Sequence, residues 1–394
     1  MEREKLPIKF FAPRDIDELR IEGSGTSEKP KWVLSGQELK NRAEYLSDSL
    51  NTIETIMEKR KDSPVPFSFI ARIQEDATAK SKRKDIANFF QVKEMSSVIG
   101  ITATNKLIVS FDSLSEFGKI SERLKDCTNN DYAISCITDF EEFLPNVYEA
   151  EESCNYKIKL IDYQNYEQNL VMRRLLEHTL NNKKIEYNKT DYSEKFYVYK
   201  LKNVTNAMLD ELKEADIFNA LFSVEPMPKY VISLDFLEED DDIPIKKPDS
   251  EKNYMTIGIL DNGIETIPHL KPWIDIERWS PYPESSINPT HGTFVAGIAL
   301  YGDECEGKGW VGHKGIKLFD AAVFPDNSKE GLDEDELIAN IKEAVKLYNE
   351  QVKIWNLSIS ITRPVSDNKF SDFAIALDAL QDEYNVLICK SAGN

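Results

Sequence analysis

The feature that most constrains the fold of this chain is the apolar segment of residues 255–260, which is followed at once by Asp261-Asn262-Gly263. A strand that is apolar along its whole length is buried on both faces, as in parallel sheets covered by helices. The Asn-Gly pair after the aspartate is a turn signal. The segment therefore predicts a parallel α/β sheet with Asp261 at the carboxyl end of a strand, where open α/β sheets place their sites.

A second candidate site residue, His291, comes thirty residues after Asp261 and directly follows Thr290. Threonine is a residue type that caps helices, and the segment after it predicts a helix. Its small residues permit close packing: Gly292, Ala296, Gly297 and Ala299. The positive end of the helix dipole disfavours imidazolium, so we expect the His291 ring to remain available as a base.

Three more segments continue the alternation of strands and helices to the end of the chain. They are a core strand at 318–324 preceded by Trp310-Val311-Gly312, an amphipathic helix at 336–348 that leads to a strand at 354–358, and a strand at 386–394 that ends in Asn394. In this order, the five segments resemble the motifs of the subtilisin-like serine proteases (subtilases, peptidase S8).

The resemblance implies a role for each site residue. His291 would accept the proton of a serine hydroxyl and return it to the leaving amine, while Asp261 would hold the imidazole tautomer. The side-chain amide of Asn394, preceded by the substrate-binding Gly393, would donate to the oxyanion. The backbone of an extended protein or peptide substrate would pair with Leu357, Ser358, Ile359 and Ser360.

The sequence also departs from the family pattern. Asn262 stands where Ser or Thr is usual, and Ser360 and Ile361 replace a Gly-Gly pair beside the main specificity pocket, which we expect to be narrowed. The Gly-Thr-Ser nucleophile block of the family lies well downstream of the asparagine, whereas this sequence ends at Asn394. Gly25-Thr26-Ser27 precedes the candidate aspartate, which inverts the family order, and we reject it as nucleophile. We expect a fragment of a longer protease that is inactive alone.

The front half of the chain predicts two α+β units. Residues 37–59 carry one apolar stripe at helical spacing, which predicts an amphipathic helix. The order β-α-β-β-α-β follows twice, first over residues 67–137, with 133–137 as the last strand, and then over residues 156–225. The second unit occupies the position of a subtilase propeptide and is similar to it in pattern.

The predicted fold class is α/β, an incomplete subtilisin-like parallel-sheet domain preceded by two ferredoxin-like or propeptide-like α+β units. The predicted parts are an irregular segment plus amphipathic helix (1–62), an α+β unit (63–145), a propeptide-like α+β unit (150–232), an acidic linker (233–252) and the N-terminal part of the catalytic domain (253–394).

Composition excludes several classes of partner. The net charge is −20, from 69 acidic and 49 basic residues, which argues against a nucleic-acid partner, because binding to phosphates is driven by Lys and Arg. No apolar run is long enough for a membrane span or a secretory signal, so we expect a cytoplasmic protein. The five cysteines are scattered and indicate neither disulfides nor zinc.

Metal binding is not indicated by the residues themselves. Subtilases often bind calcium, but the carboxylates of Asp326, Asp333 and Asp335 do not have the spacing of a calcium loop. We therefore predict no cofactor and no metal ligand, and leave calcium open.

Two functions remain. The first is a serine endopeptidase of the subtilisin type whose serine lies beyond this sequence, with the N-terminal units as a chaperone or as the binding site of a regulatory protein. The second is a non-catalytic binding or regulatory protein on a subtilase scaffold. A dinucleotide-binding fold is excluded, because no G-x-G-x-x-G motif follows the strand at 255–260.

Overall fold

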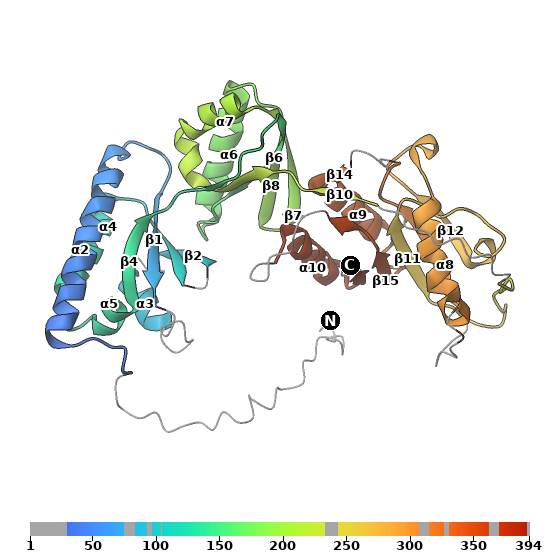
Figure 1. Ribbon diagram of the computed structural model, residues 1–394, viewed down its shortest axis with the longest axis horizontal. Coiled ribbons are helices and arrows are strands. Elements are labelled where there is room, and N and C mark those ends of the chain that lie inside the picture. Colours follow the sequence, from blue (N-terminus) through green and yellow to red (C-terminus); the bar gives the residue numbers. More distant parts are fainter. Residues whose placement is uncertain are drawn as a thin grey trace. The chain divides into compact units, whose positions relative to one another are not determined.

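The computed structural model of the protein divides into two compact units, Met1–Phe143 and Leu144–Asn394 (Figure 1). The residues that it describes are 30–74, 83–92, 97–103, 105–232, 243–305, 307, 315–326, 331–361 and 370–391. Within these ranges, no helix has the length and apolar character that crossing a membrane requires.

The first unit is built on an antiparallel sheet with the strand order β2-β3-β1-β4. Its strands are β1 (Phe67–Ile73), β2 (Val98–Ala103), β3 (Lys106–Phe111) and β4 (Ile137–Glu142). Read from β4, the strands follow the order 4-1-3-2, and the connections agree with the predicted split βαβ arrangement.

Among the described residues of this unit, four helices accompany the sheet: α2 (Gly36–Lys59), α3 (Arg83–Phe89), α4 (Leu114–Lys125) and α5 (Asp131–Cys136). The predicted apolar stripe of α2 is confirmed, since its buried residues are Leu39, Ala43, Leu46, Leu50, Ile53 and Met57. They share one hydrophobic cluster with the phenylalanines of β1 and β3. The unit therefore has a core of its own.

The prediction of a strand at 133–137 is wrong. Residues 131–136 form helix α5, and the last strand begins only at Ile137. The helix starts with a bond from the Ile134 N–H to the Asn130 carbonyl, 2.9 Å long. A short apolar run has no periodicity that separates a buried helical turn from a strand, which explains the error.

The second unit begins with another antiparallel sheet, of order β5-β9-β6-β8-β7. Its elements are β5 (Asn146–Val147), β6 (Cys154–Leu160), α6 (Tyr166–Asn182), β7 (Tyr187–Ser193), β8 (Phe196–Val204), α7 (Asn206–Lys213), a 3-10 turn (Asp216–Ala220) and β9 (Leu221–Pro226). Apart from the short β5, this is again the order 4-1-3-2, and the predicted sequence of elements is present.

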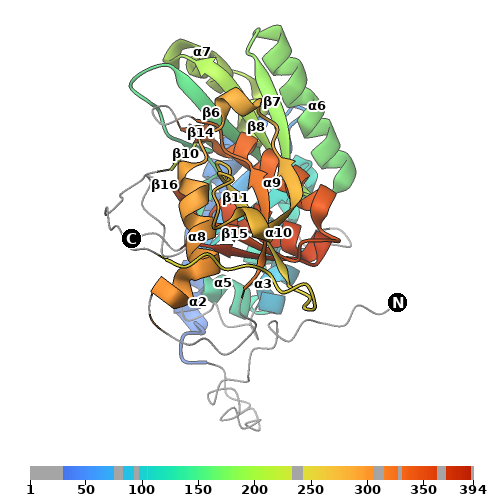
Figure 2. The ribbon, with the colours of Figure 1, turned by 90° about the vertical axis from the view of Figure 1, so that its right-hand side faces the viewer.

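The rest of the second unit is a parallel sheet of order β12-β13-β11-β15-β17. Its strands are β11 (Thr256–Asp261), β12 (Ile274–Trp279), β13 (Lys317–Ala322), β15 (Ile354–Leu357) and β17 (Leu387–Lys390). Helix α8 (Thr290–Cys305) packs on one face, and α9 (Glu334–Tyr348) and α10 (Asp372–Tyr384) pack on the other (Figures 1 and 2). This is the covered parallel sheet that the apolar strand predicted.

A small third sheet joins the two parts of this unit. Its central strand, β10 (Lys229–Val231), follows the antiparallel sheet in sequence and lies between β14 (Leu332–Asp333) and β16 (Ser360–Ile361). Both pairings are antiparallel. Strand β10 was not predicted from the sequence, because its two partners come more than 100 residues later.

The antiparallel sheet also packs directly on α9 and α10 through buried ion pairs. Lys157 Nζ on β6 lies 2.6 Å from Glu334 Oε1 and 2.5 Å from Asp372 Oδ2, and its side chain is only 2% exposed. Lys159 contacts the same Asp372 carboxylate at 3.1 Å. Glu334 is the first residue of α9, and Asp372 is the first residue of α10.

A second lysine repeats this arrangement. Lys200 Nζ on β8 lies 3.1 Å from both Asp333 Oδ2 and Asp335 Oδ1 at the start of α9. Burial opposes the charged form of Lys200, but the two carboxylates raise its pKa above the ordinary value. Two of the three carboxylates considered as calcium ligands, Asp333 and Asp335, therefore contact this lysine.

Candidate active site

Strand β11 carries Asp261 to the carboxyl edge of the parallel sheet. It lies between β13 and β15, and the side chains of Ile259, Leu260 and Asp261 are at most 1% exposed. The backbone of Gly258 approaches Trp355 on β15 so closely that a Cβ atom would lie 2.3 Å from its ring. Glycine at this position leaves room for the indole of Trp355 beside the backbone of β11.

Helix α8 begins at Thr290 and carries His291 in its first turn. Thr290 was expected to cap the helix, but its hydroxyl donates instead to Asn288 Oδ1 at 2.6 Å. A Cβ atom on Gly292 would lie 2.1 Å from the Gly263 carbonyl oxygen. The absence of a side chain at Gly292 thus lets the start of α8 approach the turn that follows Asp261.

The structure brings the two predicted site residues together. His291 Nδ1 lies 2.8 Å from Oδ1 and 2.9 Å from Oδ2 of Asp261. The imidazole is 13% exposed, whereas the carboxylate is 1% exposed. An acceptor at Nδ1 favours the tautomer with its proton on that atom, which leaves Nε2 as the basic nitrogen.

The environment of Asp261 is strongly desolvated. Burial raises the pKa of its carboxyl above the ordinary value, and the hydrogen bond with His291 offsets only part of this effect. The Asn262 N–H also donates to Oδ1, at 2.8 Å. The carboxylate is therefore held from two sides and has little freedom to rotate away from the imidazole.

Asn262 has a further role that the sequence did not indicate. Its Oδ1 accepts the Gly292 N–H at 2.9 Å, in a buried bond that joins the turn after β11 to the first turn of α8. The side chain at the position where the family has Ser or Thr therefore bridges the two site-bearing elements. Its place between the two motifs was visible in the sequence, but its bonding partner was not.

An ion pair between Asp320 and Arg278 holds the same turn through hydrogen bonds to the backbone of Ile264. Asp320 Oδ2 on β13 accepts the Ile264 N–H at 2.9 Å and Arg278 Nε at 2.6 Å. Arg278 also donates to the Ile264 carbonyl. Burial raises the pKa of Asp320 to about 6, although Arg278 works against this shift. The sequence did contain a sign of this role, since Asp320 is the single charged residue within the apolar segment 318–324.

The four residues that were expected to pair with substrate extend from the end of β15 to the start of β16. Leu357 lies within the parallel sheet opposite Lys390, and Ile359 is 1% exposed. The Ser358 hydroxyl accepts a bond from Asn356 at 3.0 Å. The backbone of Ser360 is paired with Val231 of β10.

Two predicted site residues, Gly393 and Asn394, lie outside the described residues, as does Gly25-Thr26-Ser27. Within the described ranges, no group of three or more His, Cys, Asp or Glu side chains is arranged to hold a metal ion. The site that can be described therefore consists of the carboxylate, the imidazole and the turn that joins them.

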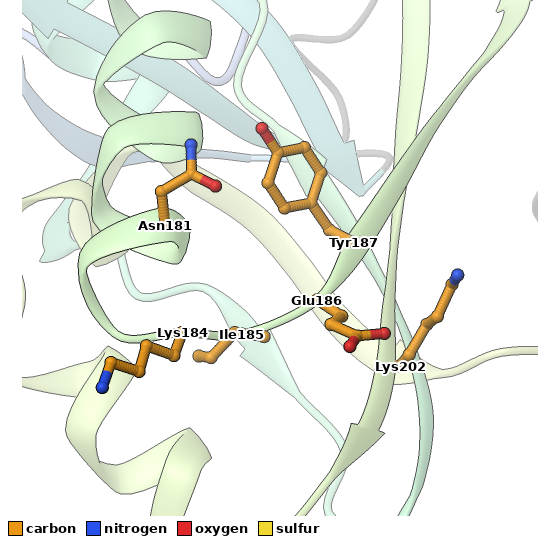
Figure 3. A pocket seen from close by; sticks show the side chains of 6 residues that line it. All are labelled: Asn181, Lys184, Ile185, Glu186, Tyr187 and Lys202. Carbon is orange, nitrogen blue, oxygen red and sulfur yellow. The ribbon is translucent and has the colours of Figure 1, made fainter.

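A surface hollow lies elsewhere in the second unit, at the end of α6 and the start of β7 (Figure 3). Its lining residues are Asn181, Lys184, Ile185, Glu186, Tyr187 and Lys202. Figure 3 shows Lys184 pointing away from the other charged side chains. The hollow shares no residue with the Asp261–His291 pair.

A buried carboxylate that orients an imidazole is the base half of the triad that activates a nucleophile in hydrolases of several unrelated folds. Here the pair lies at the carboxyl edge of a parallel sheet, on a strand end and a helix start. Residues 252–394 match the model of the subtilase family, peptidase S8. The predicted fold class and the predicted family are both confirmed.

Among solved structures, the chain is similar to fervidolysin from Fervidobacterium pennivorans, described as a keratinolytic enzyme related to subtilisin. The identity is 17% and the TM-score 0.40, and the likeness covers 64% of this chain and 42% of that chain. The chain thus spans less than half the length of that protein. Among curated proteins, none matches significantly.

Proposed function

We propose that residues 253–394 are the N-terminal part of a serine endopeptidase domain that hydrolyses peptide bonds with an Asp-His-Ser triad. Asp261 and His291 are two members of the triad, and residues that follow Asn394 supply the serine. The observation that carries the proposal is the close contact of His291 Nδ1 with both Asp261 oxygens, at 2.8 and 2.9 Å. The subtilase match over the same residues supports it.

In this mechanism, His291 Nε2 takes the proton of the serine hydroxyl during attack on the peptide carbonyl and then returns it to the leaving amine. Asp261 holds the ring and stabilises the imidazolium that forms. The Asn394 amide donates to the oxyanion. Asn262 is a positioning residue, because its bond to Gly292 fixes the two site-bearing elements relative to each other.

The part of the chain that precedes this domain acts as an attached inhibitor. The edge that would pair with substrate, at Ser360, is already paired with Val231 of β10. On the other side, the Glu334 N–H donates to the Pro228 carbonyl at 3.0 Å. Strand addition to a free edge is a common mode of peptide binding, so a substrate and β10 compete for one position. This agrees with the predicted propeptide-like character of residues 150–232.

The test is covalent labelling by a fluorophosphonate probe, with protein made from the complete coding sequence. We expect labelling of one serine, and a decrease of about four orders of magnitude in its rate in Asp261→Asn, as in the serine-protease template. His178→Ala is the matched control for His291→Ala, since His178 is exposed on α6 and its Nε2 lies 2.9 Å from the side-chain amide of Asn182, on the same helix. Absence of labelling under all conditions would favour a non-catalytic scaffold.

The inhibitory role has its own test. Val231→Pro removes an N–H from the central strand of the small sheet and adds a ring that a central strand does not accommodate. We expect faster labelling of the complete protein by the probe. An unchanged labelling rate in this variant contradicts the inhibitory role and leaves the triad proposal intact.

A further inference from the structure

The side chain of Tyr230, at the centre of β10, occupies a built pocket. It is 2% exposed, and its ring packs against Phe373 of α10 with the centroids 4.7 Å apart. Its hydroxyl donates to Glu334 Oε2 at 3.4 Å. By contrast, the neighbouring Lys229 is exposed. The short strand is thus held by backbone pairing and by one buried side chain.

The carboxylate at the end of this pocket needs hydrogen-bond donors. Glu334 is 2% exposed, and its Oε1 accepts from Lys157 at 2.6 Å and from the Tyr192 hydroxyl at 3.0 Å. Oε2 faces the Tyr230 hydroxyl. Glu334 is also the first residue of α9, where the helix dipole favours the negative charge. A buried carboxylate of this kind is costly to leave without a donor.

We infer that this pocket is a substrate subsite that selects tyrosine in the position of Tyr230, and that Glu334 is the residue that determines the selection. The inference rests on the proposed function, because it requires that a substrate strand take the place of β10. Backbone pairing does not depend on side chains, so selectivity at such an edge comes from pockets like this one.

The chemistry separates tyrosine from phenylalanine. Both rings can pack on Phe373, but only the phenol can donate to Oε2. A site built to bond a hydroxyl discriminates strongly against the analogue that lacks it, because its own polar group is then left unpaired. If the antiparallel sheet leaves together with β10, Glu334 also loses its hydrogen bonds with Lys157 and Tyr192. The substrate hydroxyl is then one of fewer donors to this carboxylate.

The experiment compares two fluorogenic peptides that copy residues 226–236 and differ only in Tyr or Phe at the position of Tyr230. The enzyme is the protein made from the complete coding sequence, and its active fraction is counted by fluorophosphonate labelling. We expect kcat/KM to be about tenfold or more higher for the tyrosine peptide, as for loss of a hydrogen bond to a charged group. Lys229→Gln in the peptide is the control and should change kcat/KM by less than about threefold.

Two variants separate the pocket from the rest of the site. In Glu334→Gln, the preference for tyrosine should fall to about threefold or less, while Glu336→Gln, an exposed glutamate on the same helix, should retain it. If Glu334→Gln does not fold, the ratio of kcat/KM for the tyrosine peptide to that for the phenylalanine peptide, measured with the unchanged protein, still tests the inference. A ratio near one in labelled enzyme overturns the inference and leaves the protease proposal standing. If no serine is labelled and neither peptide is cleaved, both fail.

Discussion

Replacing Lys157 by methionine tests how the antiparallel sheet is held on helices α9 and α10. The variant keeps the apolar stem and removes the ammonium group from between Glu334 Oε1, at 2.6 Å, and Asp372 Oδ2, at 2.5 Å. Removing one partner of a buried ion pair costs about 3–5 kcal/mol, because the remaining charge is left without compensation. Asp372 keeps Lys159 at 3.1 Å, so we expect the lower end, about 3 kcal/mol.

The effect should be fully present at neutral pH. Burial opposes the charged form of Lys157, but the carboxylates of Glu334 and Asp372 raise its pKa above the ordinary value of 10.5. A group whose pKa is raised by folding stabilises the protein below its ordinary pKa, and this stabilisation is lost only as the pH rises through the folded value. The comparison is therefore made at pH 7, where the ammonium is charged in both the folded and the unfolded state.

The assay is amide hydrogen exchange followed by mass spectrometry over β7 and α9, which lie against each other. A loss of about 3 kcal/mol corresponds to exchange faster by roughly a hundredfold. Lys213→Met is the control, since Lys213 forms a similar pair of contacts with Glu149 and Asp210 at the surface. Exposed pairs contribute about 0–1 kcal/mol, so its exchange should change by less than about fivefold. Equal exchange in the two variants would refute the reasoning.

Three further predictions concern the parallel sheet. Burial raises the pKa of Asp320 from 3.8 to about 6, so ionisation of this carboxyl destabilises the folded state as the pH rises through this range. Between pH 4 and 7, the free energy of unfolding of Asp320→Asn, measured by urea denaturation, should rise by up to about 3 kcal/mol relative to that of the unchanged protein. A difference between the two proteins that does not change with pH would contradict this. Gly258→Ala places a Cβ atom 2.3 Å from the ring of Trp355 and should cost about 1–3 kcal/mol, measured as a lower midpoint of thermal unfolding; an unchanged midpoint would speak against the close packing. Gly292→Ala should separate the imidazole from the carboxylate and slow fluorophosphonate labelling of the complete protein about a hundredfold, whereas Gly297→Ala, with no atom within 4 Å of the added Cβ, should label normally.

Local patterns in the sequence predicted most of the elements. The strand at 67–73 and the hairpin strands at 98–103 and 106–111 have the predicted bounds, because each is a short apolar run between clear turn signals. The contact between Asp261 and His291 was expected from the spacing of two motifs. The prediction succeeded because Asp261 ends strand β11 and His291 lies in the first turn of helix α8, and both of these boundaries are marked in the sequence.

What the sequence could not predict depends on contacts between distant segments. The pairing of Val231 with Ser360 joins two short segments whose side-chain patterns say nothing about each other. The burial of Lys157 was equally hidden, because a lysine in a strand is ordinarily placed on the solvent face, and its carboxylate partners come about 180 or more residues later. The role of Asn262 likewise depends on a backbone N–H of another element.

The covalent connection from Val231 to the strand that begins at Thr256 has a consequence for competition at the Ser360 edge. A segment tethered to its own binding edge competes at an effective concentration of the order of millimolar, whatever the amount of protein present. A substrate at micromolar concentration must therefore bind about a thousandfold more tightly than the tethered segment to displace it. Cutting the connection removes this advantage, so after a single backbone cleavage the segment competes only at its own concentration in solution.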